Sequence, residues 1–279
     1  MLVDTLRDIM VRKLVKVGPR DNLLQVQSLI QRFEVGRVIV ADDSKPLGIL
    51  TRKDMIRCLL EDTSDRDLDE IKASDVMTRD LVGLSESASL GGAARLMIEK
   101  GISSVIVVDS QGKLLGLVTK TDLCLYFGSR ASPGQRVRDW MTPKPISVRG
   151  SASIFKVAAL MQQQRISRVL VQNTKLEGVV TVSDLVRAGV VFNPKGPIEA
   201  RKPIMMRGMM VKASTLSLLS ALDVMTANPV TADVDGDLSS VAKLMSTHRI
   251  SGVPVVDRKA RLVGVLTKTD IVRAIAKIS

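Results

Sequence analysis

The sequence is poor in aromatic residues, with one Trp, one Tyr and four Phe in 279 residues. Aliphatic residues and Met must therefore fill the core of a chain that is 45% hydrophobic and long enough for one large or two ordinary domains. The scarcity also argues against a nucleic-acid-binding surface built on base stacking, and no known DNA-reading motif is visible.

Histidine and cysteine are rare too. His248 is the single histidine, and Cys58 and Cys124 are the two cysteines. They show no metal-ligand spacing, no Cys–His pair and no disulfide framework, so we expect two buried thiols in a reducing compartment. The chain also lacks a Gly-rich dinucleotide loop and a carboxylate pair. We predict a protein that is not an enzyme and needs neither a metal nor a catalytic cofactor.

Long apolar runs are missing as well, and none approaches the length of a membrane span. Residues 1–8 (MLVDTLRD) carry charges where a signal peptide needs an apolar run. We therefore expect a cytoplasmic protein with no membrane partner.

Charge of one sign is in excess. Lys and Arg number 41 against 29 Asp and Glu, which gives a formal net charge of +12. The excess favours an anionic partner such as a phosphorylated small molecule, a nucleic acid or an acidic protein surface. A solvated basic surface explains it equally well. Most cations are dispersed, apart from a cluster at Arg201, Lys202, Arg207 and Lys212.

The chain does contain an internal repeat. The pattern G-h-h-T-x-x-D (h, hydrophobic) occurs at 48–54, 116–122, 178–184 and 264–270. Ahead of each copy stands D-x-M, at 8–10, 75–77, 139–141 and 223–225. The steps from Met to Gly are 38, 39, 37 and 39 residues, and two patterns at a near-constant offset indicate four repeats of one unit.

Each repeat is predicted to fold as β-α-β-β-α, in the α/β (α+β) class. The helix before the central strand shows apolar residues at spacings of three and four, as in 154–161 and 238–245. Such a unit has too little apolar surface to fold alone, so repeats should pair. We place repeats 1 to 4 at 1–62, 70–128, 134–190 and 221–279, with the boundary between two pairs at 128–138.

A connector at 191–220 separates repeats 3 and 4. Its methionines are Met205, Met206, Met209 and Met210. They fit an ordered connector that packs on the repeats, and they also fit an adaptable docking surface for a partner.

The T-x-x-D turns, where a strand runs into a helix, are the candidate sites. We call them corners 1 to 4: Thr51–Asp54, Thr119–Asp122, Thr181–Asp184 and Thr267–Asp270. A capping box explains Thr and Asp completely. A second hydroxyl, however, is present in three corners, as Thr121, Ser183 and Thr269. Two hydroxyls and a carboxylate at a helix N-terminus also suit a sugar phosphate.

Cations follow the first long helix of repeats 3 and 4, at Arg165, His248 and Arg249. They suit a phosphate, and they equally suit the negative end of the helix dipole. Repeat 2 has Lys100 one position away, and repeat 1 has Glu34.

These patterns together, D-x-M-T, R-I-S-x-V-x-V and G-h-h-T-x-[ST]-D, resemble cystathionine-β-synthase (CBS) domains. In that family two repeats pair into a Bateman module, and two modules can form a disc. The four-repeat layout is similar to that of the gamma subunit of AMP-activated protein kinase. The resemblance implies a regulatory sensor that binds AMP, ADP, ATP or S-adenosylmethionine between paired repeats and signals to an unknown protein effector.

The resemblance also implies roles for single residues. Ribose and phosphate would be held by Asp54, Asp122, Asp184 and Asp270 with Thr51, Thr119, Thr121, Thr181, Ser183, Thr267 and Thr269. The base pocket, supplied by the repeat opposite the Asp, would be lined by Thr142, Ile146, Ile166, Thr226, Val230 and Ile250. The phosphates would face Arg165, His248, Arg249 and Lys268.

Repeat 1 departs from the family pattern. It has Val11 for the motif Thr, Lys13 for a small residue or Pro, Glu34 for the cation and Lys53 for the second hydroxyl. We therefore expect ligand first in residues 129–279. A basic nucleic-acid-binding protein remains the alternative function. The sequence leaves open whether the disc forms within one chain or in a homodimer.

Overall fold

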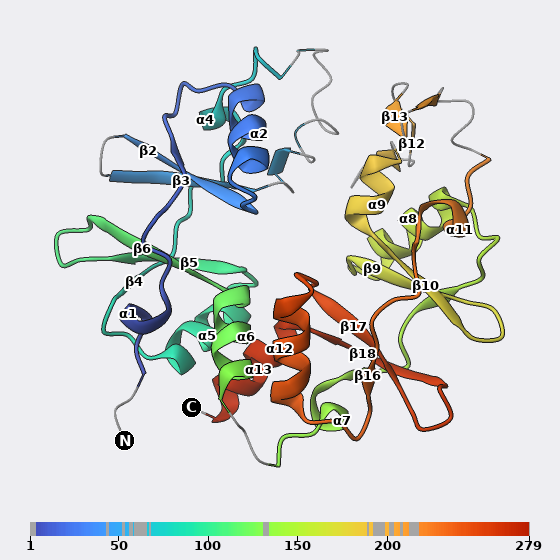
Figure 1. Ribbon diagram of the computed structural model, residues 1–279. Helices are drawn as coiled ribbons and strands as arrows, with labels where there is room; N and C mark the ends of the chain where they lie inside the picture. The colour runs from blue at the N-terminus through green and yellow to red at the C-terminus, as the bar shows by residue number, and fades with distance from the viewer. Residues whose placement is uncertain are drawn as a thin grey trace. The chain divides into compact units, whose positions relative to one another are not determined.

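The computed structural model describes residues 4–42, 45–51, 54, 55, 58, 66, 68–130, 134–188, 190, 191, 199, 200, 204–206, 209–211 and 218–278. Within these residues repeats 2, 3 and 4 follow the predicted β-α-β-β-α order, and repeat 1 follows it as far as its third strand (Figure 1). A one-turn helix that carries the D-x-M pattern precedes each of them.

Repeats 1 and 2 form the first pair. Repeat 1 contains α1 (Leu6–Ile9), β1 (Lys16–Val17), α2 (Leu23–Arg32), β2 (Arg37–Asp42) and β3 (Lys45–Thr51). Repeat 2 contains α4 (Ala73–Val76), β4 (Gly83–Ser85), α5 (Leu90–Glu99), β5 (Ser104–Val108), β6 (Leu114–Thr119) and α6 (Lys120–Ser129). In each repeat the first strand runs parallel to the second, and the third is antiparallel to the second.

Repeats 3 and 4 form the second pair. Repeat 3 contains α7 (Val137–Trp140), β7 (Thr142–Pro143), β8 (Ser147–Val148), α8 (Ile154–Gln163), β9 (Arg168–Gln172), β10 (Leu176–Thr181) and α9 (Val182–Arg187). Repeat 4 contains α11 (Ala221–Val224), β15 (Thr226–Ala227), β16 (Ala232–Asp233), α12 (Leu238–Thr247), β17 (Gly252–Val256), β18 (Leu262–Thr267) and α13 (Lys268–Ile278). Their sheets have the strand orders β15-β10-β9-β8 and β16-β17-β18-β7.

The connector holds two short antiparallel ladders. β11 (Val190–Val191) pairs with β12 (Glu199–Ala200), and β13 (Ile204–Met206) pairs with β14 (Met209–Val211). The side chains of its methionines lie outside the described part of the chain, so the choice between a packed connector and a docking surface stays a prediction.

The two repeats of a pair exchange the segments that follow D-x-M. β7 of repeat 3 pairs with β18 of repeat 4, and β15 of repeat 4 pairs with β10 of repeat 3. The first pair does the same through single bridges, from Val11 to Leu117 and from Thr78 to Ile49. Each corner strand therefore has a segment of the partner repeat at its edge.

The Gly that opens each corner pattern makes room for the partner repeat's Met. The four contacts pair Gly48 with Met77, Gly116 with Met10, Gly178 with Met225 and Gly264 with Met141. A Cβ added to Gly178 would lie 2.2 Å from the Sδ of Met225, closer than any unstrained contact. The two sequence patterns are thus the two halves of one interface between repeats.

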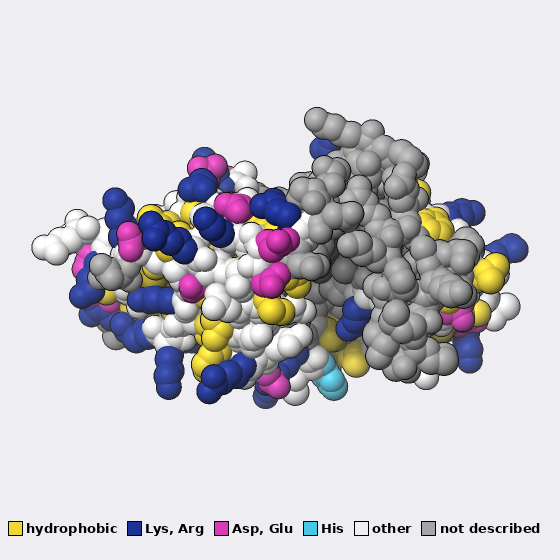
Figure 2. Space-filling model, turned by 90° about the horizontal axis from the view of Figure 1, so that it is seen from above, with side chains coloured by type: hydrophobic (Ala, Val, Ile, Leu, Met, Phe, Trp, Pro, Cys, Tyr) yellow, Lys and Arg dark blue, Asp and Glu magenta, His cyan; other side chains and the backbone are white. Residues whose placement is uncertain are grey.

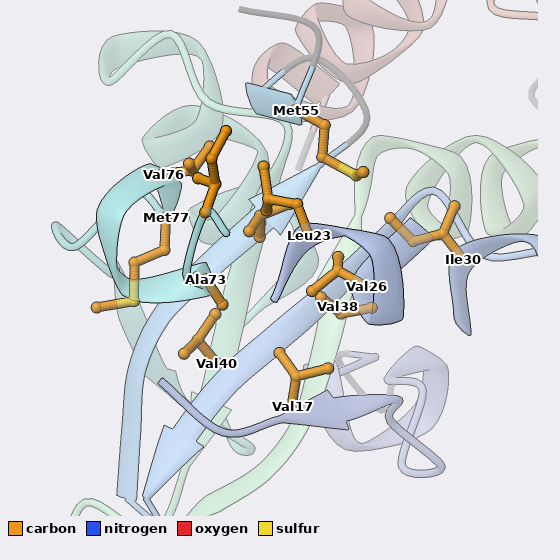
Figure 3. Packing of buried hydrophobic residues seen from close by; sticks show 12 residues of the cluster. Val17, Leu23, Val26, Ile30, Val38, Val40, Met55, Ala73, Val76 and Met77 are labelled. Atoms are coloured by element: carbon orange, nitrogen blue, oxygen red, sulfur yellow. The ribbon is translucent and has the colours of Figure 1, made fainter. Parts of the chain in front are cut away.

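The core is formed by apolar residues that recur at helical spacing. In repeat 1, Leu23 and Val26 of α2 point toward Val38 and Val40 of β2, and Met77 of repeat 2 belongs to the same buried cluster (Figure 3). Apolar residues at helical spacing thus bury one face of α2 on the sheet, as the sequence predicted. The partner repeat completes this core, which is why one repeat alone buries too little.

By packing, the chain divides into two compact units. The first contains Met1–Ser132, Ala242–Arg249 and Lys268–Ser279, and the second contains Pro133–Val241 and Ile250–Thr267. Within the first unit, α13 packs against α5 and α6 (Figure 1). A Cβ added to Gly128 of α6 would lie 2.6 Å from the backbone nitrogen of Lys243. Helical segments of repeat 4 therefore belong to the first unit.

Neither cysteine forms a disulfide, and the two differ in burial. Cys124 is buried as predicted, and this burial raises the pKa of its thiol to about 12. Cys58 is only half-buried, so the prediction of two buried thiols is wrong for that residue. Among the described residues, no helix has the length and apolarity that a membrane crossing requires.

Candidate functional site

The corners lie at the ends of β3, β6, β10 and β18, and hydrogen bonds between Thr and Asp are found in corners 1, 2 and 3. In corner 2, Oδ2 of Asp122 accepts hydrogen bonds from the backbone N–H and the hydroxyl of Thr119, both at 2.7 Å. In corner 3, the corresponding distances between Thr181 and Asp184 are 2.8 and 2.5 Å. Corner 1 has the same two hydrogen bonds. The capping box orients the carboxylate and leaves Oδ1 for another partner.

Two corner carboxylates use Oδ1 for an arginine one helical turn further on. Asp184 and Asp270 are buried, and they pair through Oδ1 with Arg187 and Arg273. The side chains of Arg187 and Arg273 are 75% and 52% exposed. Ion pairs with such exposed partners contribute little, so a ribose hydroxyl can displace the guanidinium from Oδ1 at small cost.

This arginine was not predicted from the sequence, although a signal for it is present. A D-x-x-R pattern extends three of the four corners, and in repeat 2 Leu125 replaces the Arg. Arg57, the equivalent residue of repeat 1, lies outside the described residues. Leu125 is 56% exposed and occupies the place of the missing arginine.

The second hydroxyls have different surroundings. Nζ of Lys268 donates to Oγ1 of Thr121 at 3.0 Å, and Nζ of Lys120 donates to Oγ1 of Thr269 at 3.1 Å. These reciprocal hydrogen bonds join the N-termini of α6 and α13. Thr121 and Ser183 are both exposed, and Thr269 is half-buried. Two of the predicted ligand hydroxyls, and the predicted phosphate cation Lys268, are thus engaged in an interhelix contact.

The predicted phosphate cations Arg165 and Arg249 lie just beyond the ends of α8 and α12 in a left-handed conformation, both with φ of 53°. Glu34 and Gly101 have the equivalent place after α2 and α5, with φ of 50° and 64°. Glycine adopts this backbone freely, whereas other residues are strained there by about 1 kcal/mol. Both arginines are exposed.

Arg249 forms an ion pair with Glu34. Its Nη1 lies 2.9 Å from Oε2 of Glu34, and both side chains are more than 70% exposed. Glu34, which carries the wrong sign for a phosphate, is therefore a counter-ion of a predicted phosphate cation. His248 is the exposed C-cap residue of α12, before Arg249.

The exchanged segments bring predicted base-pocket residues beside the corner of the partner repeat. Thr226 lies opposite Val179, two residues before Thr181, and Thr142 lies opposite Val265, two residues before Thr267. Both threonines are exposed.

The other four predicted base-pocket residues are all half-buried. Ile146 and Ile166 pack against the core of repeat 3. Val230 lies in the segment between β15 and β16, and Ile250 lies between α12 and β17. The structure thus gives Ile146 and Ile166 a packing role as well.

Sequence analysis also missed Arg37 and Arg168, which fill the variable position of R-I-S-x-V and its equivalent in repeat 1. Both are half-buried, and each reaches across its pair: Arg37 to Ser103 and Arg168 to Ser251. Within the described residues, no group of His, Cys, Asp and Glu is assembled that could hold a metal ion.

Comparison with known families identifies the repeats. The family model described as CBS domain matches residues 6–61, 73–129, 137–191 and 221–277, which include all four corners. The chain belongs to the CBS domain family, and the resemblance stated from its motifs is confirmed.

Similar proteins are known from archaea. MJ1404 of Methanocaldococcus jannaschii is 26% identical over 284 residues, which cover all of this chain and 63% of that protein. MJ1225 of the same organism, a proposed archaeal homologue of g-AMPK, is 21% identical over 99% of this chain and 100% of its own length.

Two solved structures share the fold over the whole chain. The crystal structure of MJ1225 has a TM-score of 0.76 at 19% identity and covers 98% of this chain and 100% of its own. A conserved protein of Pyrococcus horikoshii has a TM-score of 0.64 at 18% identity, with the same coverage.

Proposed function

We propose that the protein is a regulatory sensor that binds an adenosine-containing ligand, AMP, ADP, ATP or S-adenosylmethionine, between paired repeats. Occupancy would favour one arrangement of the chain and be conveyed to a partner protein, to the extent that the ligand binds that arrangement better. Membership of the CBS domain family supports a regulatory role.

The chemistry of the corners supports a ribose ligand. A buried carboxylate, held in place through Oδ2 by its own Thr, keeps Oδ1 for acceptance from a vicinal diol. The helix N-terminus behind it favours a negatively charged group. The exchanged strand of the partner repeat runs beside the same corner, where it can contact the base.

The observation that carries the proposal is the left-handed conformation of Arg165 and Arg249. Repeat 2 has Gly101 at the same place, so the fold itself is satisfied by glycine. An exposed arginine that strains the backbone gains nothing from packing. Its presence is explained if the guanidinium serves a phosphate, to which arginine binds with two parallel hydrogen bonds.

The direct test is binding by the full chain. Thermal shift and calorimetry with AMP, ADP, ATP and S-adenosylmethionine should show at least one ligand that raises the unfolding midpoint. A ligand at a hundred times its Kd stabilises the folded state by about 2.7 kcal/mol. If the folded protein binds none of the four ligands, the proposal is refuted. Asp184→Asn and Asp270→Asn should weaken binding and leave the protein folded.

A sharper test separates charge from backbone strain. Arg165→Gly should leave stability unchanged or raise it by about 1 kcal/mol, while it lowers AMP affinity about tenfold and spares adenosine. Ala260→Gly is the matched control, because it relieves the same left-handed backbone, with φ of 56°, without changing any charge. Equal AMP affinity in Arg165→Gly and wild type would remove the main support for a phosphate role.

The nucleic-acid alternative gains no comparable support. Among the described residues on the face shown in Figure 2, Lys and Arg side chains are interspersed with Asp and Glu. Nucleic-acid-binding proteins typically show a continuous basic patch or stripe.

A further inference from the structure

One position differs between odd and even repeats in the same way in both pairs. Arg37 opens β2 of repeat 1 and Arg168 opens β9 of repeat 3. At the equivalent place, repeat 2 has Ser104 and repeat 4 has Gly252. Each pair therefore combines one arginine with one small residue.

In the second pair, the arginine reaches from the strand beside corner 3 to the residue that precedes the strand beside corner 4. The backbone of Arg168 lies opposite Thr181 of corner 3 in the β9–β10 ladder. Its Nη2 donates to Oγ of Ser251 in repeat 4 at 2.9 Å. The next residue, Gly252, lies opposite Thr267 of corner 4. A single guanidinium thus connects the starts of β9 and β17, the strands that pair with those leading into corners 3 and 4.

The small residue is needed to admit this guanidinium. A Cβ added to Gly252 would lie 1.9 Å from Nη1 and 2.8 Å from Cζ of Arg168. These distances are far below van der Waals contact. Side chains cannot occupy both equivalent positions in this arrangement, so the pair has room for one central cation.

The first pair repeats the geometry with looser contacts. Arg37 lies opposite Thr51 of corner 1, and Nη1 of Arg37 is 3.5 Å from Oγ of Ser103. The neighbouring Ser104 lies opposite Thr119 of corner 2.

The charge of Arg37 interacts with both corners of its pair. Burial lowers the pKa of its guanidinium, while the carboxylates of Asp122 and Asp54 act to raise it. Asp54 belongs to corner 1 and Asp122 to corner 2, so the electrostatics agree with the geometry.

We propose that the two corners of a pair share one anion position, at Arg37 or Arg168, so that a pair binds one phosphorylated ligand at a time. This inference rests on the proposed function. Each corner has its own carboxylate for a ribose, but two phosphate groups at one guanidinium repel each other at short range. An uncharged nucleoside meets no such limit and fills both corners.

The stoichiometry of AMP tests the sharing. We would titrate the full chain and its Asp184→Asn, Asp270→Asn and doubly substituted variants by calorimetry. If the corners share one position, each single variant binds as many AMP molecules per chain as wild type, and the double variant binds one fewer. Loss of one AMP in either single variant overturns the inference, as does a double variant with full stoichiometry. Wild-type protein that binds neither AMP nor adenosine overturns the proposed function as well.

Arg168→Gln tests the position itself, when placed in each of the two single-corner variants. AMP affinity should fall about tenfold or more in both backgrounds, because a charged hydrogen bond to phosphate is lost, while adenosine affinity stays within about twofold. Arg258→Gln, at a side chain that is 85% exposed, controls for net charge. Gly252→Ala offers a second route, because it displaces the guanidinium without changing the charge. An effect on one corner only would overturn the sharing.

Discussion

Corners 2 and 3 have the same Thr–Asp capping box in different surroundings. Corner 2 begins α6, which packs against α13 and whose Thr121 accepts a hydrogen bond from Lys268. Corner 3 begins α9, where Ser183 is exposed and Arg187 pairs with the carboxylate. The comparison teaches that Thr and Asp build the turn, whereas the residues around them decide between a helix contact and a turn open to a ligand.

The largest effect that we expect concerns Cys124, on the covered side of α6. Burial raises the pKa of its thiol from 9.0 to about 12, and its Sγ lies 3.8 Å from the carbonyl oxygen of Lys268. At pH 8 the thiolate is then roughly a thousandfold scarcer than in an ordinary cysteine. Alkylation by iodoacetamide, followed by mass spectrometry, should be slower by at least that factor than in the denatured chain. A rate near that of a free thiol would mean that α13 leaves α6 uncovered in solution.

The same thiol gives stability a pH dependence. The pKa of Cys124 is higher in the folded state than its ordinary value of 9.0, so the folded state keeps a proton that the unfolded state loses. This contribution is complete below pH 9 and is lost as the pH rises toward 12. Urea unfolding at pH 8 and pH 10 should show a lower free energy of unfolding at pH 10. In Cys124→Ala the decrease should be smaller, and an unchanged decrease would assign it to other groups.

Next in size is the close approach of α6 to repeat 4. Gly128→Ala places a Cβ 2.6 Å from the backbone nitrogen of Lys243, and backbone cannot move aside as a side chain can. Overpacking of this kind costs about 1–3 kcal/mol, against about 1 kcal/mol gained in helix propensity. We expect a net loss of up to about 2 kcal/mol in the free energy of unfolding, measured with urea.

Gly92→Ala in α5 is the matched control for this change. The added Cβ would meet only the Oγ of Ser89, at 3.1 Å, so helix propensity should prevail and stability should not fall. Equal effects of the two substitutions would show that the packing at Gly128 is not tight.

Much of the structure of the corners could be predicted from the sequence, because helix caps and helix faces depend on residues that are neighbours along the chain. The Thr–Asp boxes and the apolar face of α2 follow from the spacing of a few neighbouring residues. The exchange between repeats could not be predicted. A two-residue ladder such as that of β7 with β18 is too short to show a period in the sequence. No neighbouring residue indicates that Gly178 contacts Met225.

The central arginines were missed for a related reason. Read along the chain, the residues at that position are Arg37, Ser104, Arg168 and Gly252, which resembles free variation at a surface strand. Only the pairing shows that Arg168 needs the room at Gly252. Side chains that are complementary across a pseudo-symmetric interface leave no signal within either repeat.

A smaller effect is expected from the interhelix contact of Lys268 and Thr121. Their hydrogen bond is 3.0 Å long and partly exposed, so Thr121→Ala should cost about 0.5–1 kcal/mol. Ser183→Ala, the same deletion in corner 3, should change stability by less than about 0.5 kcal/mol because Ser183 is exposed. A double-mutant cycle with Lys268→Met isolates the pair. A coupling energy near zero would mean that the contact contributes nothing.

The smallest change in stability is expected when corner 3 is given the residue of corner 2, by Arg187→Leu. The ion pair with Asp184 involves a side chain that is 75% exposed, so its loss should alter the free energy of unfolding by less than about 0.5 kcal/mol. Because Oδ1 of Asp184 is then free for a ribose hydroxyl, calorimetry with adenosine should show affinity about two- to fivefold higher. A lower affinity would reverse this interpretation: Arg187 would then contact the ligand, and Leu125 would mark corner 2 as the poorer site because it lacks that contact.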